Sequence, residues 1–376
     1  MLKRWDCLII GAGAAGIGIG TVLKELGLHN YAILERHAVG ASFGMWPEEM
    51  RLITPSFTSN AYGMLDLNAV ALNTSPAYTL STEHPTGKEY AKYLQAVSDY
   101  HQLPVYCGID VTAVRQEADG FCVSTSTGEW YTRFVIWAAG EFQYPRLDVI
   151  PGSEYAIHNS QIASWAALEG EQFVVIGGYE SGTDAAIHLS RLGKNVTMLD
   201  RRSRMLDKGS SDPSMELSPY TKDRLRHEIQ HGRISFIGGC EVQWIEPQAQ
   251  GGYLIYCEDD HGKQHVIHSE AAPIMATGFT GSLRLIEHLI QRSGNGAIRL
   301  GPADESLLAP GLFVSGPSVM HDQLMFCFIY KFRQRFAVIA HRIGTLLGYD
   351  VSRLEHYRGE GMFLDDLSCC QENCTC

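Results

Sequence analysis

The chain has 376 residues, of which 45% are apolar and 19% are charged, and its formal net charge is −12. This length exceeds what a single core usually serves, so we expect two domains. The acidic balance argues against a nucleic-acid partner, and the sequence holds no apolar run long enough to span a membrane. The composition is that of an ordinary globular protein, so the function has to be sought in the motifs.

The amino terminus, MLKRWDCLIIGAGAAG, places basic residues before an apolar run, as a signal peptide does. It lacks a small-residue cleavage pattern after a proper apolar region, so we predict a first β-strand here. Most of the cysteines are scattered singly, which is typical of small core side chains in the reducing cytosol, and we expect a cytoplasmic protein. The scattered cysteines are Cys7, Cys107, Cys122, Cys240, Cys257 and Cys327.

Residues 6–35 predict a βαβ unit that binds a dinucleotide. In its G-x-G-x-x-G spacing, Gly11 permits the tight turn, Gly13 lets a pyrophosphate approach the backbone, and Gly16 lets helix and strand pack closely. The helix N-terminus offers unpaired N–H groups to the phosphates. Glu35 lies 24 residues after Gly11, where an acid can accept hydrogen bonds from ribose hydroxyls. A glycine-rich turn without a ligand is the alternative. The predicted segments are a strand at 7–10, a helix at 17–26, a helix C-cap at Gly27 and a strand at 31–35.

A second turn, GGYESG at residues 177–182, has the same spacing but carries Tyr179 at the middle glycine position. We predict a strand at 172–176 before it, and after it a helix at 181–193 and a strand at 195–200. A side chain at position 179 would hold a pyrophosphate further from the backbone than glycine does. Binding can persist, because the helix start still presents its N–H groups. The residues that present them are Glu180, Ser181 and Gly182.

Basic residues follow the second unit, whose last strand ends at Asp200, 23 residues after Gly177. An acid alone at this position indicates NAD, whereas the forked donors of arginine suit the 2′-phosphate of NADPH. Arg201, Arg202 and Arg204 therefore favour NADPH. A basic turn exposed to solvent is the alternative.

Two such units in one chain predict one flavin and one nicotinamide cofactor, between which a hydride passes. The fold class that this predicts is α/β, with two Rossmann-like dinucleotide-binding domains in the two-dinucleotide-binding flavoprotein arrangement. We expect an FAD-binding domain from residues 1–150 and 281–376 and an NAD(P)H-binding domain from residues 151–280. Segment 121–140 alternates like a β-hairpin. The predicted ends of later strands are marked by Ala138, Ala139 and Gly140, by Thr277 and Gly278, and by Gly316.

The carboxy-terminal third predicts a long helix over residues 323–348, whose N-terminus could stabilise negative charge on a reduced flavin. His321 next to Asp322 is expected to cap this helix, with a proton donor near the flavin as the alternative. Segment 211–229, rich in turn formers and then helical, either covers the nicotinamide site or is a plain loop. The residues expected on a solvated face of the long helix are Tyr330, Lys331, Arg333 and Arg335.

Six sequence motifs together carry a resemblance: GAGAAG from Gly11, WPEEMRLITPSFTSN from Trp46, WAAGEFQYPR from Trp137, GGYESGTDAA, MATGF, and the tail DDLSCCQENCTC. Over essentially its whole length the chain resembles the flavin-containing monooxygenase-like FAD/NAD(P)-dependent oxidoreductases, in particular the cobalt–zinc–cadmium-resistance-associated flavoproteins. The resemblance implies FAD bound without a covalent link, Phe43 and Trp46 against the flavin, and Val111 in the strand near the adenine.

The predicted cofactor sites combine the motifs with this resemblance. The predicted FAD-binding residues are Gly11, Gly13, Ala14, Ala15, Gly16, Glu35, Arg36, Phe43, Trp46, Val111, Ala139, Gly140 and Gly316. The predicted NADPH-binding residues are Gly177, Tyr179, Glu180, Ser181, Gly182, Arg201, Arg202 and Gly278.

Three departures weaken a monooxygenase assignment. The F-x-G-x-x-x-H-x-x-x-W signature is only echoed, with His158 and Trp165 at stretched spacing. Pro317 stands where an aspartate usually follows the last FAD strand, so ribityl binding would need another group such as Asp322. Tyr179 is the third departure, and the chain also resembles bacillithiol-disulfide reductases, which likewise lack a strict second glycine motif.

Four cysteines crowd the polar tail of residues 366–376, which cannot bury them in a core of its own. Adjacent thiols can bind a soft metal or exchange disulfides, and the LSCC sequence resembles the C-terminal thiol pair of mercuric reductases. The spacing is not that of a zinc site, and no metal site is certain. The candidate catalytic residues are Cys369, Cys370, Cys374 and Cys376.

The leading hypothesis is thus an NADPH-oxidising FAD enzyme that acts as a monooxygenase on a small molecule. A thiol-disulfide or metal-thiol reductase that uses the tail cysteines is the main alternative, and a non-enzymatic flavin or metal sensor is the third. A homodimer is left open, since the tail could serve a neighbouring subunit or the flavin of its own chain.

Overall fold

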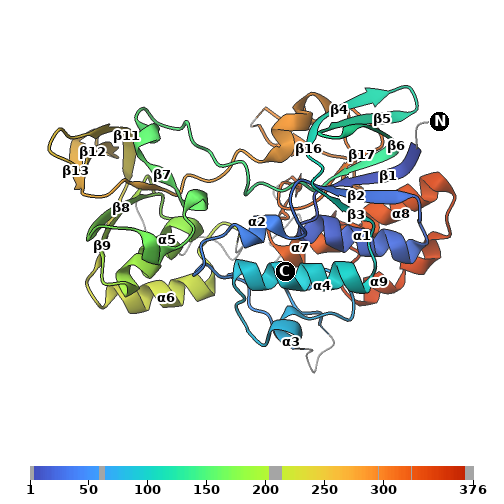
Figure 1. The fold of residues 1–376 in the computed structure, drawn as a ribbon, viewed down its shortest axis with the longest axis horizontal. Coiled ribbons are helices and arrows are strands. Elements are labelled where there is room, and N and C mark those ends of the chain that lie inside the picture. The colour runs from blue at the N-terminus through green and yellow to red at the C-terminus, as the bar shows by residue number, and fades with distance from the viewer. Residues whose placement is uncertain (1–3, 59–63, 203–213, 295, 323, 369–376) are drawn as a thin grey trace. The chain divides into compact units, whose positions relative to one another are not determined.

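The computed structural model describes residues 4–58, 64–202, 214–294, 296–322 and 324–368 (Figure 1). By their contacts these residues form two compact units. The first unit lies within residues 1–44, 55–143 and 281–376, and the second is made of residues 45–54 and 144–280. Residues 45–54, predicted as part of the FAD-binding domain, thus pack with the second unit.

The first unit is built on a sheet in which β1 lies between β2 and β6, both parallel to it. The sheet order is β3-β2-β1-β6-β5-β4, and β17 pairs in parallel with the C-terminal end of β6. The antiparallel pairing of β5 with β6 confirms the predicted hairpin. The strands are β1 (Arg4–Ile10), β2 (Tyr31–Glu35), β3 (Val105–Cys107), β4 (Val111–Glu117), β5 (Gly120–Thr125), β6 (Gly128–Trp137) and β17 (Leu312–Val314).

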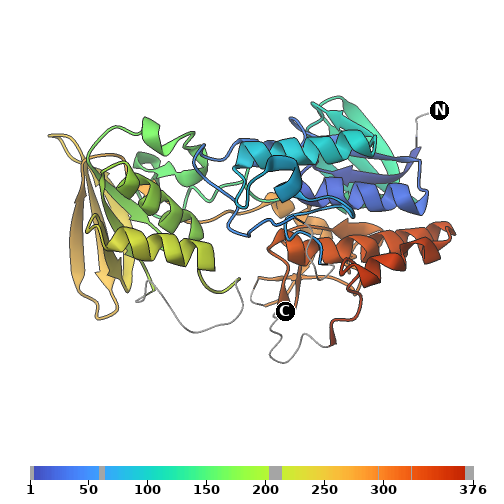
Figure 2. The ribbon, with the colours of Figure 1, turned by 90° about the horizontal axis from the view of Figure 1, so that it is seen from below.

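Helix α1 (Ala14–Leu26) is the central helix of this unit and is apolar nearly all round, as a buried helix is. It ends as predicted at Gly27, whose φ of 93° is left-handed and whose N–H bonds the carbonyls of the last turn. Figure 2 shows α1 between α4 (Gly87–Tyr100) and α8 (Phe336–Leu347). The remaining helices here are α2 (Ala41–Gly44), α3 (Pro76–Leu80), α7 (Ile329–Phe332) and α9 (His356–Gly359).

The predicted long helix over residues 323–348 is wrong in its first part. The hairpin strands β18 (Met320–His321) and β19 (Leu324–Met325) come first, and helical structure begins only at Ile329. His321 does not cap the helix; its Nε2 lies 2.5 Å from the Asp304 carboxylate.

The predicted solvated face of this helix is wrong too, because its cations are buried. Arg335 is 1% exposed and pairs with the fully buried Asp304, with Nη2 and Oδ1 2.9 Å apart. Arg333 donates to the carbonyl of Ala69 at 2.9 Å, and Lys331 is also buried. Each guanidinium finds its acceptors in segments distant in sequence, which a helical pattern does not reveal.

The second unit has an all-parallel sheet in the order β10-β9-β8-β14-β7. Its strands are β7 (Ile157–His158), β8 (Gln172–Ile176), β9 (Asn195–Asp200), β10 (Ile234–Gly238) and β14 (Ile274–Met275). An antiparallel sheet in the order β11-β12-β13 belongs to the same unit. It consists of β11 (Cys240–Pro247), β12 (Tyr253–Asp259) and β13 (Gln264–Ser269).

Alternation along β8 gives this unit two cores. Phe173 and Val175 pack with residues of helix α5 (Glu180–Arg191) and with Leu225 of helix α6 (Pro219–Ile229). Val174 and Ile176 point the other way, into a core shared with β11 and β12. The parallel sheet is therefore covered on both faces, by helices on one and by the antiparallel sheet on the other.

Candidate functional site

The first glycine-rich turn, residues 11–16, joins β1 to α1. Gly11 has a φ of 102°, and its N–H donates to the Leu34 carbonyl at 2.8 Å. A Cβ added to Gly11 would lie 2.6 Å from the Ala138 carbonyl oxygen, and one on Gly16 would lie 1.8 Å from the Gly11 carbonyl oxygen. Two of the three glycines are therefore required by close backbone contacts.

Gly13, the middle glycine, is not fixed by a backbone contact. Its φ of −81° and ψ of −166° suit any residue, and a Cβ there would meet no described atom within 4 Å. No side chain among the described residues caps α1 at Gly13, so the first N–H groups of this helix stay available. The turn thus has the free donors and the open space that a pyrophosphate needs.

Glu35 ends β2 beside this turn and is buried. Its Oε2 accepts from the Ala12 N–H at 2.8 Å and its Oε1 from the His37 N–H at 2.9 Å. Each oxygen keeps a second lone pair for a ribose hydroxyl. The Glu35 carbonyl accepts from the Ile109 N–H at 2.9 Å, and Val111, two residues later, is the first residue of β4.

Some of the other predicted FAD residues lie at the first turn, and the rest lie outside it. Gly316 lies at the first turn, since a Cβ on it would be 3.5 Å from that of Ala15, and the Cα of Ala139 would be 3.0 Å from a Cβ on Gly11. Gly140 follows with a φ of 62°. Further along, Arg36 pairs with Asp110 at 2.8 Å, and the Phe43 ring meets Tyr90 edge to face at 4.7 Å. Trp46, half-buried, belongs to the second unit.

The second glycine-rich turn, residues 177–182, repeats this construction. Gly177 has a φ of 108°, and its N–H donates to the Leu199 carbonyl at 2.8 Å. An added Cβ would lie 2.4 Å from the Ala276 carbonyl oxygen, and one on Gly182 would lie 1.9 Å from the Gly177 carbonyl oxygen. Gly278, with a φ of 82°, follows β14 as Gly140 follows β6. The two turns are thus built alike.

Tyr179 takes the middle position without strain, because its φ of −94° and ψ of −165° nearly match those of Gly13. Its ring packs against the helix-side core. Its hydroxyl donates to the Glu216 carbonyl at 2.9 Å. The tyrosine therefore binds the chain ahead of α6, and the helix start at Glu180 and Ser181 keeps its N–H groups.

The basic residues after β9 differ in their surroundings. Asp200 is buried, and its Oδ2 pairs with Nη2 of Arg202 at 2.7 Å. The same guanidinium lies 5.3 Å from the centre of the Tyr179 ring. Arg202 thus pairs with the acid that would repel a 2′-phosphate, and both Arg202 and Arg201 are exposed. Arg204 lies outside the described residues.

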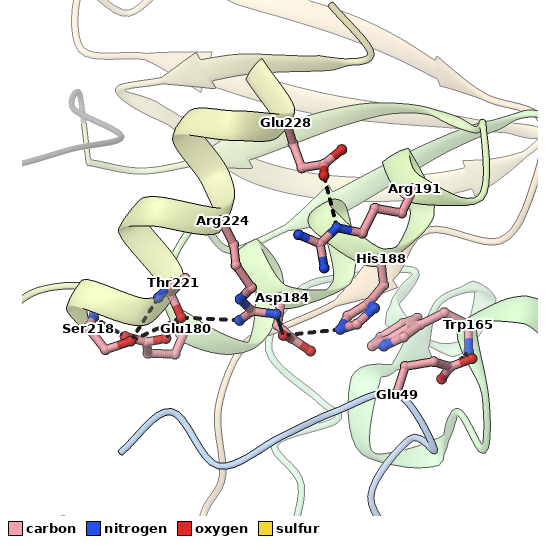
Figure 3. Close-up of polar contacts among 10 residues, drawn as sticks. All are labelled: Glu49, Trp165, Glu180, Asp184, His188, Arg191, Ser218, Thr221, Arg224 and Glu228. Atoms are coloured by element: carbon pink, nitrogen blue, oxygen red, sulfur yellow. Dashed lines mark hydrogen bonds and ion pairs between the residues drawn. The ribbon is translucent and has the colours of Figure 1, made fainter. Parts of the chain in front are cut away.

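A row of ionisable side chains runs along α5 from the second turn (Figure 3). Glu180 accepts from the Thr221 hydroxyl at 2.6 Å and from the Ser218 N–H. One turn on, the buried Asp184 pairs with Arg224 at 2.8 Å and lies 3.5 Å from His188 Nε2. Near the end of the helix, Glu228 accepts from Arg191 at 2.9 Å and from Ser190 at 3.0 Å.

These surroundings move the pKa values of Glu180 and Asp184 in opposite directions. Burial raises the pKa of the Glu180 carboxyl, and the bonds from Thr221 and Ser218 only partly oppose this. Burial alone would also raise the pKa of Asp184, but His188 and Arg224 hold it below its usual value. Asp184 is therefore a buried anion held by the Arg224 guanidinium and the His188 ring.

Residues 45–54 dock on the second unit through Glu49. Its carboxylate accepts from the Ser164 hydroxyl at 2.6 Å and from the Trp165 N–H at 3.1 Å. His158, the other residue of the weak monooxygenase signature, is buried and bonds the Gly278 carbonyl through Nε2 at 3.0 Å. His158 and Trp165 thus have structural surroundings in this unit.

The predicted catalytic cysteines, Cys369, Cys370, Cys374 and Cys376, lie outside the described residues. Four of the scattered cysteines are buried, as predicted, while Cys107 is exposed and Cys327 half-buried. Among the residues that the structure describes, no cluster of histidine, cysteine and acidic side chains could hold a metal ion. No helix in the described ranges is both long and apolar enough to cross a membrane.

The side-chain network of α5 was missed from the sequence, although one signal for it was present. Glu180, Asp184 and His188 follow one another at four-residue spacing, which puts them on one face of a helix. Glu49 carried no such signal, because its partners are more than 100 residues away in the chain.

Two βαβ units with this geometry in one chain define a two-dinucleotide-binding oxidoreductase. The model of the pyridine nucleotide-disulphide oxidoreductase family matches residues 8–316, and the chain belongs to this family of flavoproteins. The predicted fold class and the resemblance to FAD/NAD(P)-dependent oxidoreductases are confirmed.

Among curated relatives, the chain is 27% identical over 257 residues to the "Uncharacterized oxidoreductase CzcO-like" of Geobacillus kaustophilus, covering 61% of this chain and 71% of that one. It spans about half, 54%, of each of two relatives called CzcO, from Bacillus velezensis and Bacillus subtilis.

Two solved structures share the fold. The bacillithiol disulfide reductase Bdr of Staphylococcus aureus has a TM-score of 0.73 at 19% identity, over 92% of this chain and 99% of that one. A flavin-containing monooxygenase from Stenotrophomonas maltophilia has a TM-score of 0.69 at 17% identity, over 92% and 100%. Both kinds of activity thus occur on this fold, which does not choose between them.

Proposed function

We propose that this protein is an FAD-dependent flavoprotein that oxidises NADPH, with FAD at the first glycine-rich turn and NADPH at the second. The observation that carries the proposal is the repeated geometry of the two turns. In each, the first and third glycines are fixed by backbone contacts under 3 Å, and the helix N-terminus keeps its donors. When bound, FAD accepts a hydride from NADPH and passes the electrons to an acceptor.

The residues at the first turn would hold FAD by its phosphates and ribose. The first N–H groups of α1 would bind the pyrophosphate, and Glu35 would accept from the ribose hydroxyls. The fixed bonds from Ala12 and His37 to Glu35 orient its carboxylate before a ligand arrives. Ala139 and Gly316 lie at the same turn, and such small residues suit the close approach of a cofactor.

The second turn and the basic residues after β9 support NADPH over NADH. Arg202 cancels the charge of Asp200, so a 2′-phosphate meets a neutral pair together with the exposed Arg201. An unpaired acid at this position would instead favour the ribose hydroxyls of NADH.

For the electron acceptor we propose oxygen, with a small-molecule substrate, so that the enzyme is a monooxygenase. The resemblance that the sequence motifs carry over essentially the whole chain supports it. The second candidate is a thiol-disulfide or metal-thiol reductase. It is favoured by the four tail cysteines and by a bacilliredoxin reductase of Bacillus subtilis that is 22% identical over 238 residues.

Anaerobic mixing of the purified yellow protein with NADPH tests the shared half of both candidates. The flavin absorbance should bleach, and faster with NADPH than with NADH at equal concentration. Protein that holds no flavin, or flavin that neither nucleotide reduces, would refute the proposal. Reoxidation of the reduced flavin then separates the candidates. A variant with all four tail cysteines changed to serine should keep its turnover with oxygen if the enzyme is a monooxygenase. It should lose its turnover with disulfides if the enzyme is a thiol-disulfide reductase.

A further inference from the structure

Both carboxylate oxygens of Glu180 accept hydrogen bonds from the first turn of α6. Its Oε1 accepts from the Ser218 N–H and its Oε2 from the Thr221 hydroxyl, at 2.6 Å (Figure 3). Ser218 is the N-cap of α6, and its own hydroxyl oxygen accepts from the Thr221 N–H at 3.2 Å. A carboxylate at the N-terminus of a helix is stabilised by the helix dipole, so α6 offsets part of the cost of burying this charge.

Glu180 is at the same time the first residue of α5, the helix that opens at the second glycine-rich turn. A free carboxylate here would be drawn to the N-terminus of its own helix, for the same electrostatic reason. It would then compete with the phosphates for the N–H groups of α5 and repel them. The bonds to Ser218 and Thr221 direct the carboxylate to α6 instead.

Tyr179 provides a parallel connection from the adjacent position. Its hydroxyl donates to the carbonyl of Glu216, two residues before the N-cap of α6. Two consecutive residues of the glycine-rich turn therefore bind residues 216–221. In the first turn the corresponding residues are Gly13 and Ala14, which have no side chain that could make such bonds.

We propose that Glu180 is a positioning residue for the nicotinamide nucleotide: Thr221 and Ser218 hold its negative charge on α6 and so keep the N-terminus of α5 free for phosphates. This inference rests on the proposed function, in which the second turn binds NADPH. It adds that α6 does more than pack on α5: it keeps the negative charge of Glu180 away from the phosphates of the nucleotide.

The decisive variant is Thr221→Val, which removes the hydroxyl but keeps a β-branched side chain of similar volume. It should weaken binding of NADP⁺ to the FAD-loaded protein about fivefold or more at low salt, the size expected for a like charge brought within about 8 Å of a phosphate. The loss should shrink as salt is added, because the repulsion is screened. Calorimetric titration with NADP⁺ measures this without any hydride transfer.

A second substitution separates charge from packing. In Thr221→Val with Glu180→Gln, the released side chain is neutral, so affinity for NADP⁺ should return to near the wild-type value. The matched control is Ser190→Ala, which removes a similar hydroxyl–carboxylate bond between the same helices, to Glu228, far from the turn. It should leave the affinity unchanged, as should Thr221→Ser, which keeps the hydroxyl.

Two results overturn the inference while the proposed function stands: wild-type affinity in Thr221→Val, or equal losses in Thr221→Val and the double variant. Should Thr221→Val fail to fold, Glu180→Gln alone decides, since it should bind NADP⁺ at least as tightly as the wild type, and weaker binding overturns the inference. Wild-type protein that binds no NADP⁺ would refute the proposed function and this inference with it.

Discussion

The buried ion pair between α5 and α6 gives a prediction whose size follows from the structure. Asp184 is 5% exposed and Arg224 is 9% exposed, and their charged atoms are 2.8 Å apart. Removing one partner of such a pair costs about 3–5 kcal/mol, because the other charge stays buried. His188, 3.5 Å from the same carboxylate, remains as a partial substitute. We therefore expect Arg224→Met to destabilise the second unit by about 3 kcal/mol.

Thermal unfolding measures this loss. For a unit of this size, about 3 kcal/mol corresponds to a midpoint lowered by roughly 6–12 °C. The matched control is Arg226→Met on the same helix, which breaks the exposed pair with Asp223 and should cost no more than about 1 kcal/mol. Changing Asp184 to Asn together with Arg224→Met should recover much of the loss, because no unpaired charge stays buried.

The pH dependence gives the same pair a second signature. The pKa of Asp184 is held below its usual value, so its stabilising contribution is present above that usual value and is lost as pH falls through the lowered one. In Arg224→Met the penalty comes from the charged carboxylate and should shrink on acidification. Equal midpoints for Arg224→Met and Arg226→Met at neutral pH would refute the reasoning.

Three further predictions concern the turns and the docked segment. Gly177→Ala should cost at least about 1–3 kcal/mol in chemical unfolding, because φ is 108° and the new Cβ would lie 2.4 Å from the Ala276 carbonyl oxygen; an unchanged midpoint would contradict it. Arg201→Ala should weaken NADP⁺ binding about tenfold or more and leave NAD⁺ binding unchanged; equal losses would point to a structural role. Burial alone would raise the pKa of Glu49, but bonds from the Ser164 hydroxyl and backbone N–H groups lower it. The stability that the Glu49 carboxylate contributes is thus present above its usual pKa and is lost as pH falls through the lowered value. In Glu49→Gln, the unfolding midpoint measured against pH should lack this loss of stability in acid.

Much of the fold was predictable from the sequence, because local rules determine it. The strands β2, β8 and β9 have the predicted bounds to the residue. Each is a short, largely apolar run bounded by turn residues. A segment with the hydrophobic periodicity of a helix precedes or follows each of them. The first and third glycines of each turn could be predicted because a close backbone contact leaves no other residue type at those positions.

What was not predictable depends on partners far away in the chain. Arg333 and Arg335 lie in a charged stretch that was predicted to be exposed, yet their acceptors come from segments about 30 to 270 residues away. The bond from Tyr179 to Glu216 is of the same kind. A departure from the glycine pattern can be seen in the sequence, but what the new side chain touches is decided by tertiary packing.

The most direct test of two dinucleotide sites in one chain is the bleaching of the flavin in Ser181→Asp. Ser181 lies half-buried at the second turn, within the second unit, and an acid there should repel the phosphates of NADPH. The variant should stay yellow with a full complement of FAD and be bleached by dithionite. It should need far more NADPH than wild type or Ser181→Ala to be bleached anaerobically. Bleaching of the variant at the NADPH concentration that serves the wild type would contradict the account.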